Sequence, residues 1–117
     1  MEEKDKRLVL STRDSYHLIE IEDIVYCRSQ NTYTTFYLTN GQEIKVSVPI
    51  KAVVKKLDPQ CFIRPHQSFV VNVNHIRSIQ KKTNGVLILD NGEEVAISLR
   101  KKPEILQFLE KIVRIQV

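Results

Sequence analysis

A group of polar side chains interrupts the apolar stretch at residues 62–76. It consists of Arg64, His66, Gln67 and Ser68. A histidine near a serine suggests nucleophilic chemistry, but these residues have no third group in the sequence pattern to orient them as nucleophile and base. Polar groups placed between apolar runs need hydrogen-bond partners inside the protein or an external ligand. The residues alone leave both interpretations open.

Other patterns that carry chemistry are weak in this sequence. The three glycines each follow an Asn, which indicates turns and not a glycine-rich phosphate loop. Cys27 and Cys61 are far apart and flanked by apolar residues, which favours two small buried side chains over a disulfide or metal pair. The histidines His17, His66 and His75 lack the spacing of metal ligands. We therefore expect no enzyme, no metal and no cofactor.

Length and charge restrict the class of protein. The 117 residues suit one domain, 1–117, in which we expect residues 1–7 to be flexible. No apolar run reaches the ~18–20 residues that cross a bilayer, and the charged first residues do not form a secretory signal, so we expect a cytoplasmic protein. Residues 1–50 carry a net charge of −2 and residues 51–117 carry +6. A basic half suits the phosphates of a nucleic acid, although a basic solvated surface explains it equally well.

Short β segments separated by turns must position these residues. A single helical turn is expected at 21–24, a polar loop at 29–32, and a type I′ hairpin turn at Asn40-Gly41, because both residues tolerate positive φ. The predicted extended segments are 8–10, 16–21, 25–28, 33–38, 43–48, 62–64, 69–73, 76–79, 86–89 and 94–97.

Two helices complete the predicted fold, which is mostly β. One spans 49–57, with Pro49 at its first position and an apolar stripe spaced i, i+3, i+4, i+7. The other is C-terminal and begins near Lys102, after a lead-in at 99–101 that aims Arg100. We expect its apolar stripe to pack on the sheets: Ile105, Leu106, Phe108, Leu109, Ile112 and Val113.

Three motifs occur in order along the chain. The central motif is Phe62-x-Arg64-x-His66-x-Ser68-x-x-Val71-Asn72-x-x-x-Ile76. This motif and the two that flank it resemble the LytTR DNA-binding family of bacterial response regulators. Residues 24–26, 31–34 and 40–41 resemble the opening strand, loop and hairpin of the family, and 91–98 with Arg100 resemble its closing hairpin. The resemblance covers residues 8–110. It implies an elongated fold of three small antiparallel sheets with one short internal helix and a C-terminal helix.

The resemblance also implies a function. Family members regulate transcription by inserting loops into successive major grooves of short direct repeats at promoters, where they bend the DNA. They usually follow a receiver domain. We expect double-stranded DNA as the partner, a possible receiver domain in the full-length protein, no membrane, and a monomer that pairs only on tandem sites.

The DNA contacts that the resemblance implies fall in three loops. The residues are Asn31, Thr32 and Tyr33 in the first, Arg64, His66 and Gln67 in the second, and Arg100 in the third. Gln67 stands where relatives often have Arg or Lys, and glutamine pairs with adenine whereas arginine favours guanine. Leu99 occupies the position where many relatives have arginine, which leaves Arg100 for that role. Phosphate contacts are expected from Lys81, Lys82 and Lys101, and also from Lys51, Lys55, Lys56 and Lys102, each of which can equally be plain solvated surface.

Two further interpretations stay open. His66, Ser68 and Asn72 can hold the loop instead of contacting DNA. The domain can also be a protein-interaction module that has kept this fold and lost DNA binding. Gln67 in place of a cation favours that alternative, whereas Arg100 and the basic second half oppose it.

Overall fold

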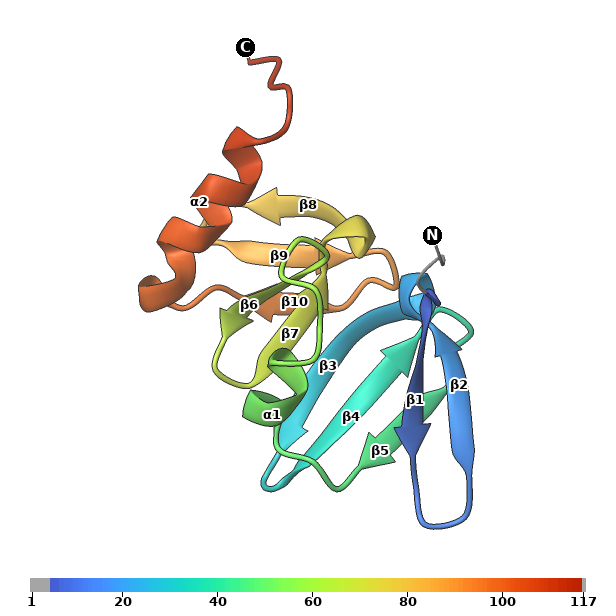
Figure 1. The fold of residues 1–117 in the computed structure, drawn as a ribbon. Coiled ribbons are helices and arrows are strands. Elements are labelled where there is room, and N and C mark those ends of the chain that lie inside the picture. The colour runs from blue at the N-terminus through green and yellow to red at the C-terminus, as the bar shows by residue number, and fades with distance from the viewer. Residues whose placement is uncertain (1–4, 117) are drawn as a thin grey trace.

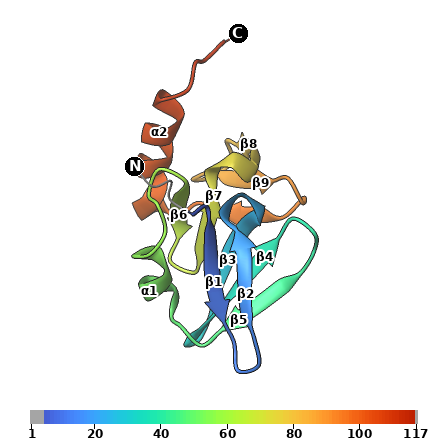
Figure 2. The same ribbon diagram turned by 45° about the vertical axis from the view of Figure 1, so that its right-hand side comes forward.

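A computed structural model describes residues 5–116, in which ten strands form three antiparallel sheets (Figures 1 and 2). Strands β1 (Arg7–Ser11) and β2 (Tyr16–Glu20) form the first sheet. The second has the order β5-β4-β3-β7-β6 and the third β10-β9-β8. Their bounds are β3 Ile24–Gln30, β4 Tyr33–Leu38, β5 Glu43–Val46, β6 Phe62–His66, β7 Phe69–Asn72, β8 Ile76–Gln80, β9 Val86–Leu89 and β10 Glu94–Ala96.

The predicted mostly-β fold with three antiparallel sheets is confirmed, and each predicted extended segment is present, with ends that differ by at most two residues. Arg7 already pairs in β1, and the N–H of Ile21 donates to the Lys6 carbonyl at 3.0 Å. The expected flexibility of residues 1–7 stays a prediction, and residues 1–4 lie outside the described part of the chain. The short helices are η1 Ile21–Asp23, α1 Ile50–Val54, η2 Val73–His75 and η3 Leu99–Lys101, and the last helix is α2 Lys102–Glu110.

The five-stranded sheet is buried on both faces because alternate side chains contribute to two cores. Cys27 faces one core, which lies under α1 and the β1–β2 hairpin. Tyr26, the preceding residue, faces the other core, which lies under the three-stranded sheet and α2. Burial raises the pKa of the Cys27 thiol, and Cys27 and Cys61 are both free. In the described residues, no helix is long and apolar enough to cross a membrane.

The predicted type I′ turn at Asn40-Gly41 is wrong. Gly41 has a φ of 86°, but Asn40 does not have a positive φ. The N–H of Gly41 donates to the Leu38 carbonyl at 3.0 Å, so Thr39 and Asn40 are the central turn residues and Gly41 follows them. This is a type I turn with a left-handed residue after it, the usual three-residue hairpin connection. The Asn40 side chain accepts the N–H of Gln42 instead of supplying a second positive φ.

The predicted polar loop at 29–32 is also wrong in length. Strand β3 continues to Gln30, which pairs with Tyr33, so Asn31 and Thr32 alone make the turn. Asn31 adopts a φ of 58°, which asparagine tolerates better than most residues. Cross-strand pairing with β4 extends the strand through polar residues whose composition suggests a loop. The result is a short tip that projects Asn31 beyond the sheet.

One helix agrees with the sequence at its start, and the other differs at both ends. Helix α2 begins at Lys102 after η3, as predicted. The first helix is only Ile50–Val54 instead of 49–57, and Pro49 is its extended cap residue and not its first helical residue. The prediction that the whole apolar stripe of the last helix packs on the sheets is wrong. Only Ile105 in α2 is fully buried, and Ile112 lies beyond the end of the helix with 52% of its surface exposed.

Candidate nucleic-acid interface

Backbone hydrogen bonds bring three loops to one edge of the molecule. The N–H of Ser29 donates to the Ser68 carbonyl at 2.8 Å, which ties the β3–β4 tip to the β6–β7 turn. The N–H of Ser98 donates to the Pro65 carbonyl at 2.9 Å, which ties the start of η3 to the same turn. The three loops that were predicted to contact DNA are therefore neighbours, although Asn31 and Arg100 are 69 positions apart in the sequence.

The β6–β7 turn and η3 enclose a shallow cavity of about 310 Å³. Its lining contains three cations and no acidic residue: Arg64, His66, Gln67, Ser98, Arg100 and Lys101. Five of these six residues were predicted to contact DNA. The side chains of Gln67 and Arg100 are exposed, whereas Arg64 and His66 are half-buried. A positive concave surface with exposed amide and guanidinium groups can donate hydrogen bonds to phosphate oxygens and to the acceptor atoms of bases.

Arg64 and His66 are held by the turn itself. The Arg64 Nη2 donates to the Gln67 carbonyl at 2.8 Å, and the His66 Nδ1 accepts the N–H of Ser68 at 3.1 Å. The His66 ring also meets the Phe69 ring edge-on, with centroids 5.9 Å apart. These contacts support the interpretation that both residues hold the loop. They leave Gln67 as the residue of this turn that is free to point outward.

Asn72 bonds only to backbone among the described residues. Its Nδ2 donates to the Ile24 carbonyl at 2.9 Å, and its Oδ1 accepts the N–H of Asn74 at 3.0 Å. The side chain is 1% exposed. Asn72 therefore joins the end of β7 to the start of β3 and lies too deep to contact a ligand.

The β3–β4 tip and the β8–β9 loop extend this edge in two directions. Asn31, Thr32 and Tyr33 are all exposed at the tip. Lys81 and Lys82 are exposed in the β8–β9 loop, whose Gly85 carbonyl accepts the N–H of Ile97 at 2.9 Å. This bond places the loop beside the segment that leads to η3.

The remaining predicted lysines differ in their surroundings. Lys101 pairs with Glu104 at 3.7 Å, so a neighbouring carboxylate partly balances its charge. Lys51, Lys55 and Lys56 belong to α1 and the turn after it, which pack on the opposite face of the five-stranded sheet from Tyr26 and Phe69. The structure does not bring these three lysines to the cavity.

Two cations at this edge were missed in the sequence. Residues directly opposite each other in neighbouring strands lie on the same sheet face. Lys45 pairs with Thr35, which pairs with Arg28, and Arg28 pairs with Phe69. Phe69 also pairs with His66, so Lys45 and Arg28 share one face with the His66 ring. The Arg28 guanidinium lies 5.8 Å from the Phe69 ring centroid, and the Lys45 Nζ lies 5.0 Å from the Tyr33 centroid. The alternation of exposed and buried residues in β3 and β5 was the available signal, but it could not say which edge the cations share.

Comparisons with known proteins agree with this geometry. The family model described as LytTr DNA-binding domain matches residues 14–110. The protein named transcriptional regulatory protein LytR of Staphylococcus aureus strain N315 is 30% identical over 95 residues, which are 80% of this chain and 38% of that protein. The sensory transduction protein LytT of Bacillus anthracis is 34% identical over 112 residues, 93% of this chain and 43% of that protein.

A solved structure has the same fold. It is the LytTr DNA-binding domain of a putative methyl-accepting/DNA response regulator from Bacillus cereus, with a TM-score of 0.78 and 26% identity, and the match covers 91% of this chain and 98% of that one. The chain spans about two-fifths of the length of the curated relatives it matches. With three loops gathered at one basic edge and a family model that matches nearly the whole chain, this protein belongs to the LytTR family of DNA-binding domains.

Proposed function

We propose that this domain binds promoter DNA in a sequence-specific manner through the edge that carries Asn31, Gln67 and Arg100. The observation that carries the proposal is the cavity between the β6–β7 turn and η3, where exposed Gln67 and Arg100 share a lining without acidic residues. Backbone hydrogen bonds fix the loops that carry Gln67 and Arg100, so binding to a base edge orders these two side chains but not the loops themselves.

The residues divide into two roles. Asn31, Gln67 and Arg100 read bases in the major groove, with Thr32 and Tyr33 beside them at the tip. Lys81, Lys82 and Lys101 contact phosphates, which set the register of the protein on the duplex. Arg28 and Lys45 add to the phosphate contacts, because Arg28 lies on the sheet face between the tip and the β6–β7 turn and Lys45 lies on the same face in β5, on the other side of the tip. Arg64 and His66 act indirectly: their hydrogen bonds stabilise the β6–β7 turn, which presents Gln67.

The domain is proposed to act without catalysis. The His66 Nδ1 accepts a backbone N–H of Ser68, which is no arrangement of a base with a nucleophile. We further propose that the domain is the output module of a response regulator, which acts in the cytoplasm with a receiver domain in the full-length protein. Alone it is a monomer, and two copies meet on short direct repeats, where they bend the DNA.

Selection of bound duplexes from a random-sequence pool, at near-physiological salt, tests this function. A short enriched motif, present as a spaced direct repeat, is the expected result. Recovery of DNA without enrichment would indicate a nonspecific basic surface. If no DNA is retained at all, a protein-interaction module with the same fold becomes the better interpretation. Gln67, which stands where relatives often have Arg or Lys, would agree with that result.

Gln67→Arg should change the base that the β6–β7 turn prefers. Glutamine pairs with N6 and N7 of adenine, whereas arginine pairs with O6 and N7 of guanine, and a good bidentate pair discriminates by ~1–3 kcal/mol. The same selection, repeated with the variant, should therefore replace an adenine by a guanine at one position of the motif. An unchanged motif would show that Gln67 does not contact a base.

Lys81→Ala should weaken binding to every duplex by a similar factor. Lys81 is exposed in the β8–β9 loop and is proposed to contact a phosphate. Removal of one phosphate contact lowers the slope of log K against log salt by ~0.9. Binding to a selected duplex and to a scrambled one, measured across a salt series, checks this. An unchanged slope would place Lys81 outside the interface.

A further inference from the structure

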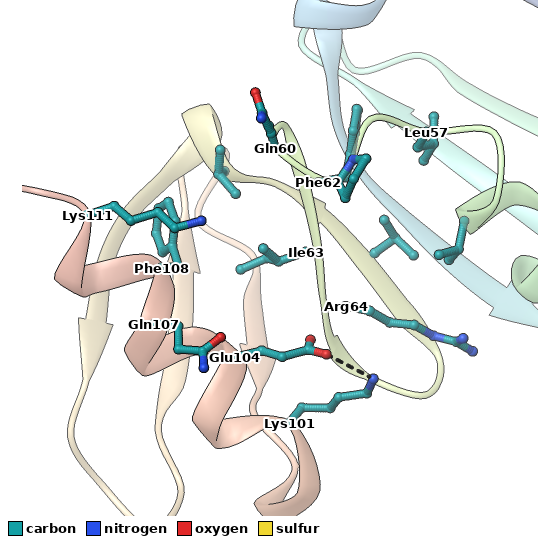
Figure 3. A pocket seen from close by; sticks show the side chains of 14 residues that line it. Leu57, Gln60, Phe62, Ile63, Arg64, Lys101, Glu104, Gln107, Phe108 and Lys111 are labelled. Atoms are coloured by element: carbon teal, nitrogen blue, oxygen red, sulfur yellow. Dashed lines mark ion pairs between the residues drawn. The ribbon is translucent and has the colours of Figure 1, made fainter.

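A groove of about 650 Å³ lies beside the candidate interface, between α2 and the segment that follows α1 (Figure 3). Strand β6 runs through the groove and is an edge strand of the five-stranded sheet. Arg64 and Lys101 line both this groove and the smaller cavity. The wall on the α1 side is mostly apolar: half-buried Val54 and Leu57 lie there with Pro59 and Gln60, over the buried side chains of Phe62 and Val70.

The outer edge of β6 offers backbone groups to the groove. The N–H of Val73 donates to the Cys61 carbonyl at 2.9 Å, so the backbone of Cys61 and, by alternation, that of Ile63 point toward β7. The carbonyl of Phe62 and the N–H of Arg64 therefore point away from β7, toward the groove. An extended segment that joins a sheet edge uses one acceptor and one donor placed in this way.

The two walls of the groove differ in polarity. Successive side chains of β6 point to opposite faces, and Figure 3 shows Phe62 on one side of the strand and Ile63 on the other, toward α2. Gln107, Phe108 and Lys111 lie on the α2 wall with Glu104, whose carboxylate pairs with Lys101 at 3.7 Å. A segment that fits must present apolar side chains to one wall and a more polar set to the other.

Residues 112–116, Ile-Val-Arg-Ile-Gln, have this pattern. They follow α2 without regular structure and project away from the sheets (Figures 1 and 2). In an extended chain Val113 and Ile115 share one side, and these two side chains are 91% and 97% exposed. The other side carries Arg114 between Ile112 and Gln116. Three of the five residues are β-branched, which favours a strand.

We propose that residues 112–116 of one copy join the β6 edge of a second copy. Val113 and Ile115 then cover the apolar wall, and Arg114 and Gln116 face the α2 wall. The segment is directed away from its own groove, which favours a second copy as the host (Figure 1). Apolar area that is exposed on both surfaces becomes buried, which is the main driving force.

This contact joins two different surfaces and is therefore heterologous. One copy offers its segment while its own groove stays free for the next copy. Successive copies on a direct repeat keep the same orientation, which a heterologous contact requires. The inference thus rests on the proposed binding to direct repeats and supplies the contact between neighbouring copies.

We expect the contact to be too weak to hold two free domains together in solution, but strong enough to make binding to tandem DNA sites cooperative. Five residues in a groove bury well under the ~1,000 Å² of a stable interface, so the domain stays monomeric when free. Tandem sites hold two copies at a high effective concentration, where a weak contact becomes cooperative.

A peptide with the sequence of residues 111–117 tests the contact without DNA. We expect its addition to the isotope-labelled domain to shift the amide signals of Phe62, Ile63 and Arg64, together with those of Leu57 and Phe108. A control peptide with V113D and I115D should shift none of them. No shift with the first peptide, or shifts confined to other surfaces, would overturn the proposal.

Duplexes with one or two copies of the selected repeat test it on DNA. The V113D/I115D double variant should bind a single repeat like the wild type, because both side chains are exposed, and should lose a cooperativity on the order of tenfold on the tandem duplex. Unchanged cooperativity in this variant would contradict the contact. If the wild-type domain does not bind a duplex with a single repeat, that result counts against the proposed DNA binding and not against the contact between copies. The peptide titration then tests the contact without DNA.

Discussion

Arg100→Ala should lower the affinity for a selected duplex by about 5- to 150-fold, which corresponds to ~1–3 kcal/mol, and should relax the preference at one base. Arg100 is exposed on η3 at the rim of the cavity, next to Gln67, and no ion pair of the described residues engages its guanidinium. A guanidinium that binds guanine bidentately contributes specificity as well as charge. Fluorescence anisotropy with the selected duplex and single-base variants of it measures both effects.

Arg13→Ala provides the matched control for Arg100→Ala. Arg13 is exposed in the turn between β1 and β2, a hairpin that packs against the other face of the five-stranded sheet. The same charge is lost, but we expect the affinity to change by less than ~0.5 kcal/mol, since charges beyond a Debye length are largely screened. Equal losses for the two variants, or equal losses on selected and random DNA for Arg100→Ala, would mean that Arg100 acts only through its charge.

Asn72→Leu should lower the free energy of unfolding by roughly 2–4 kcal/mol. Leucine is similar in size but leaves the buried carbonyl of Ile24 and the N–H of Asn74 without their partner. Each buried polar group that loses its hydrogen bond costs ~1–3 kcal/mol. Urea denaturation followed by circular dichroism measures the change, and the slope with denaturant should stay the same.

Asn74→Ala is the control for this prediction. Asn74 is the same residue type two positions away, but its side chain is exposed and makes none of the hydrogen bonds found among the described residues. Surface substitutions of this kind usually change stability by less than ~0.5 kcal/mol. A similar loss of stability in both variants would show that Asn72 does not hold β3 and β7 together through its side chain.

The type of each strand and of both α-helices was predictable from the sequence because local patterns determine it, whereas the 3₁₀ helix η2 was not predicted. The β-branched and aromatic composition of 33–38 and the apolar run 86–89 between two Asn-Gly turns match β4 and β9 at both ends, and Pro103 places the start of α2 at Lys102. The motif around Arg64, His66 and Ser68 indicated the family through residue types and spacing alone. These features depend on neighbours within a few positions, which a sequence displays directly.

The tertiary structure decided everything that depends on a partner strand. Pairing of Gln30 with Tyr33 shortened the first loop to a tip, and the register of β5, β4, β3 and β7 placed Lys45 and Arg28 on one face. The bond of Arg64 to the Gln67 carbonyl made Arg64 a support for the turn. Because β6 is an edge strand, a groove remains beside it. Because α2 ends at Glu110, Val113 and Ile115 lie outside the helix and are exposed. Which strands become neighbours depends on contacts between residues far apart in the chain, and no local period records those contacts.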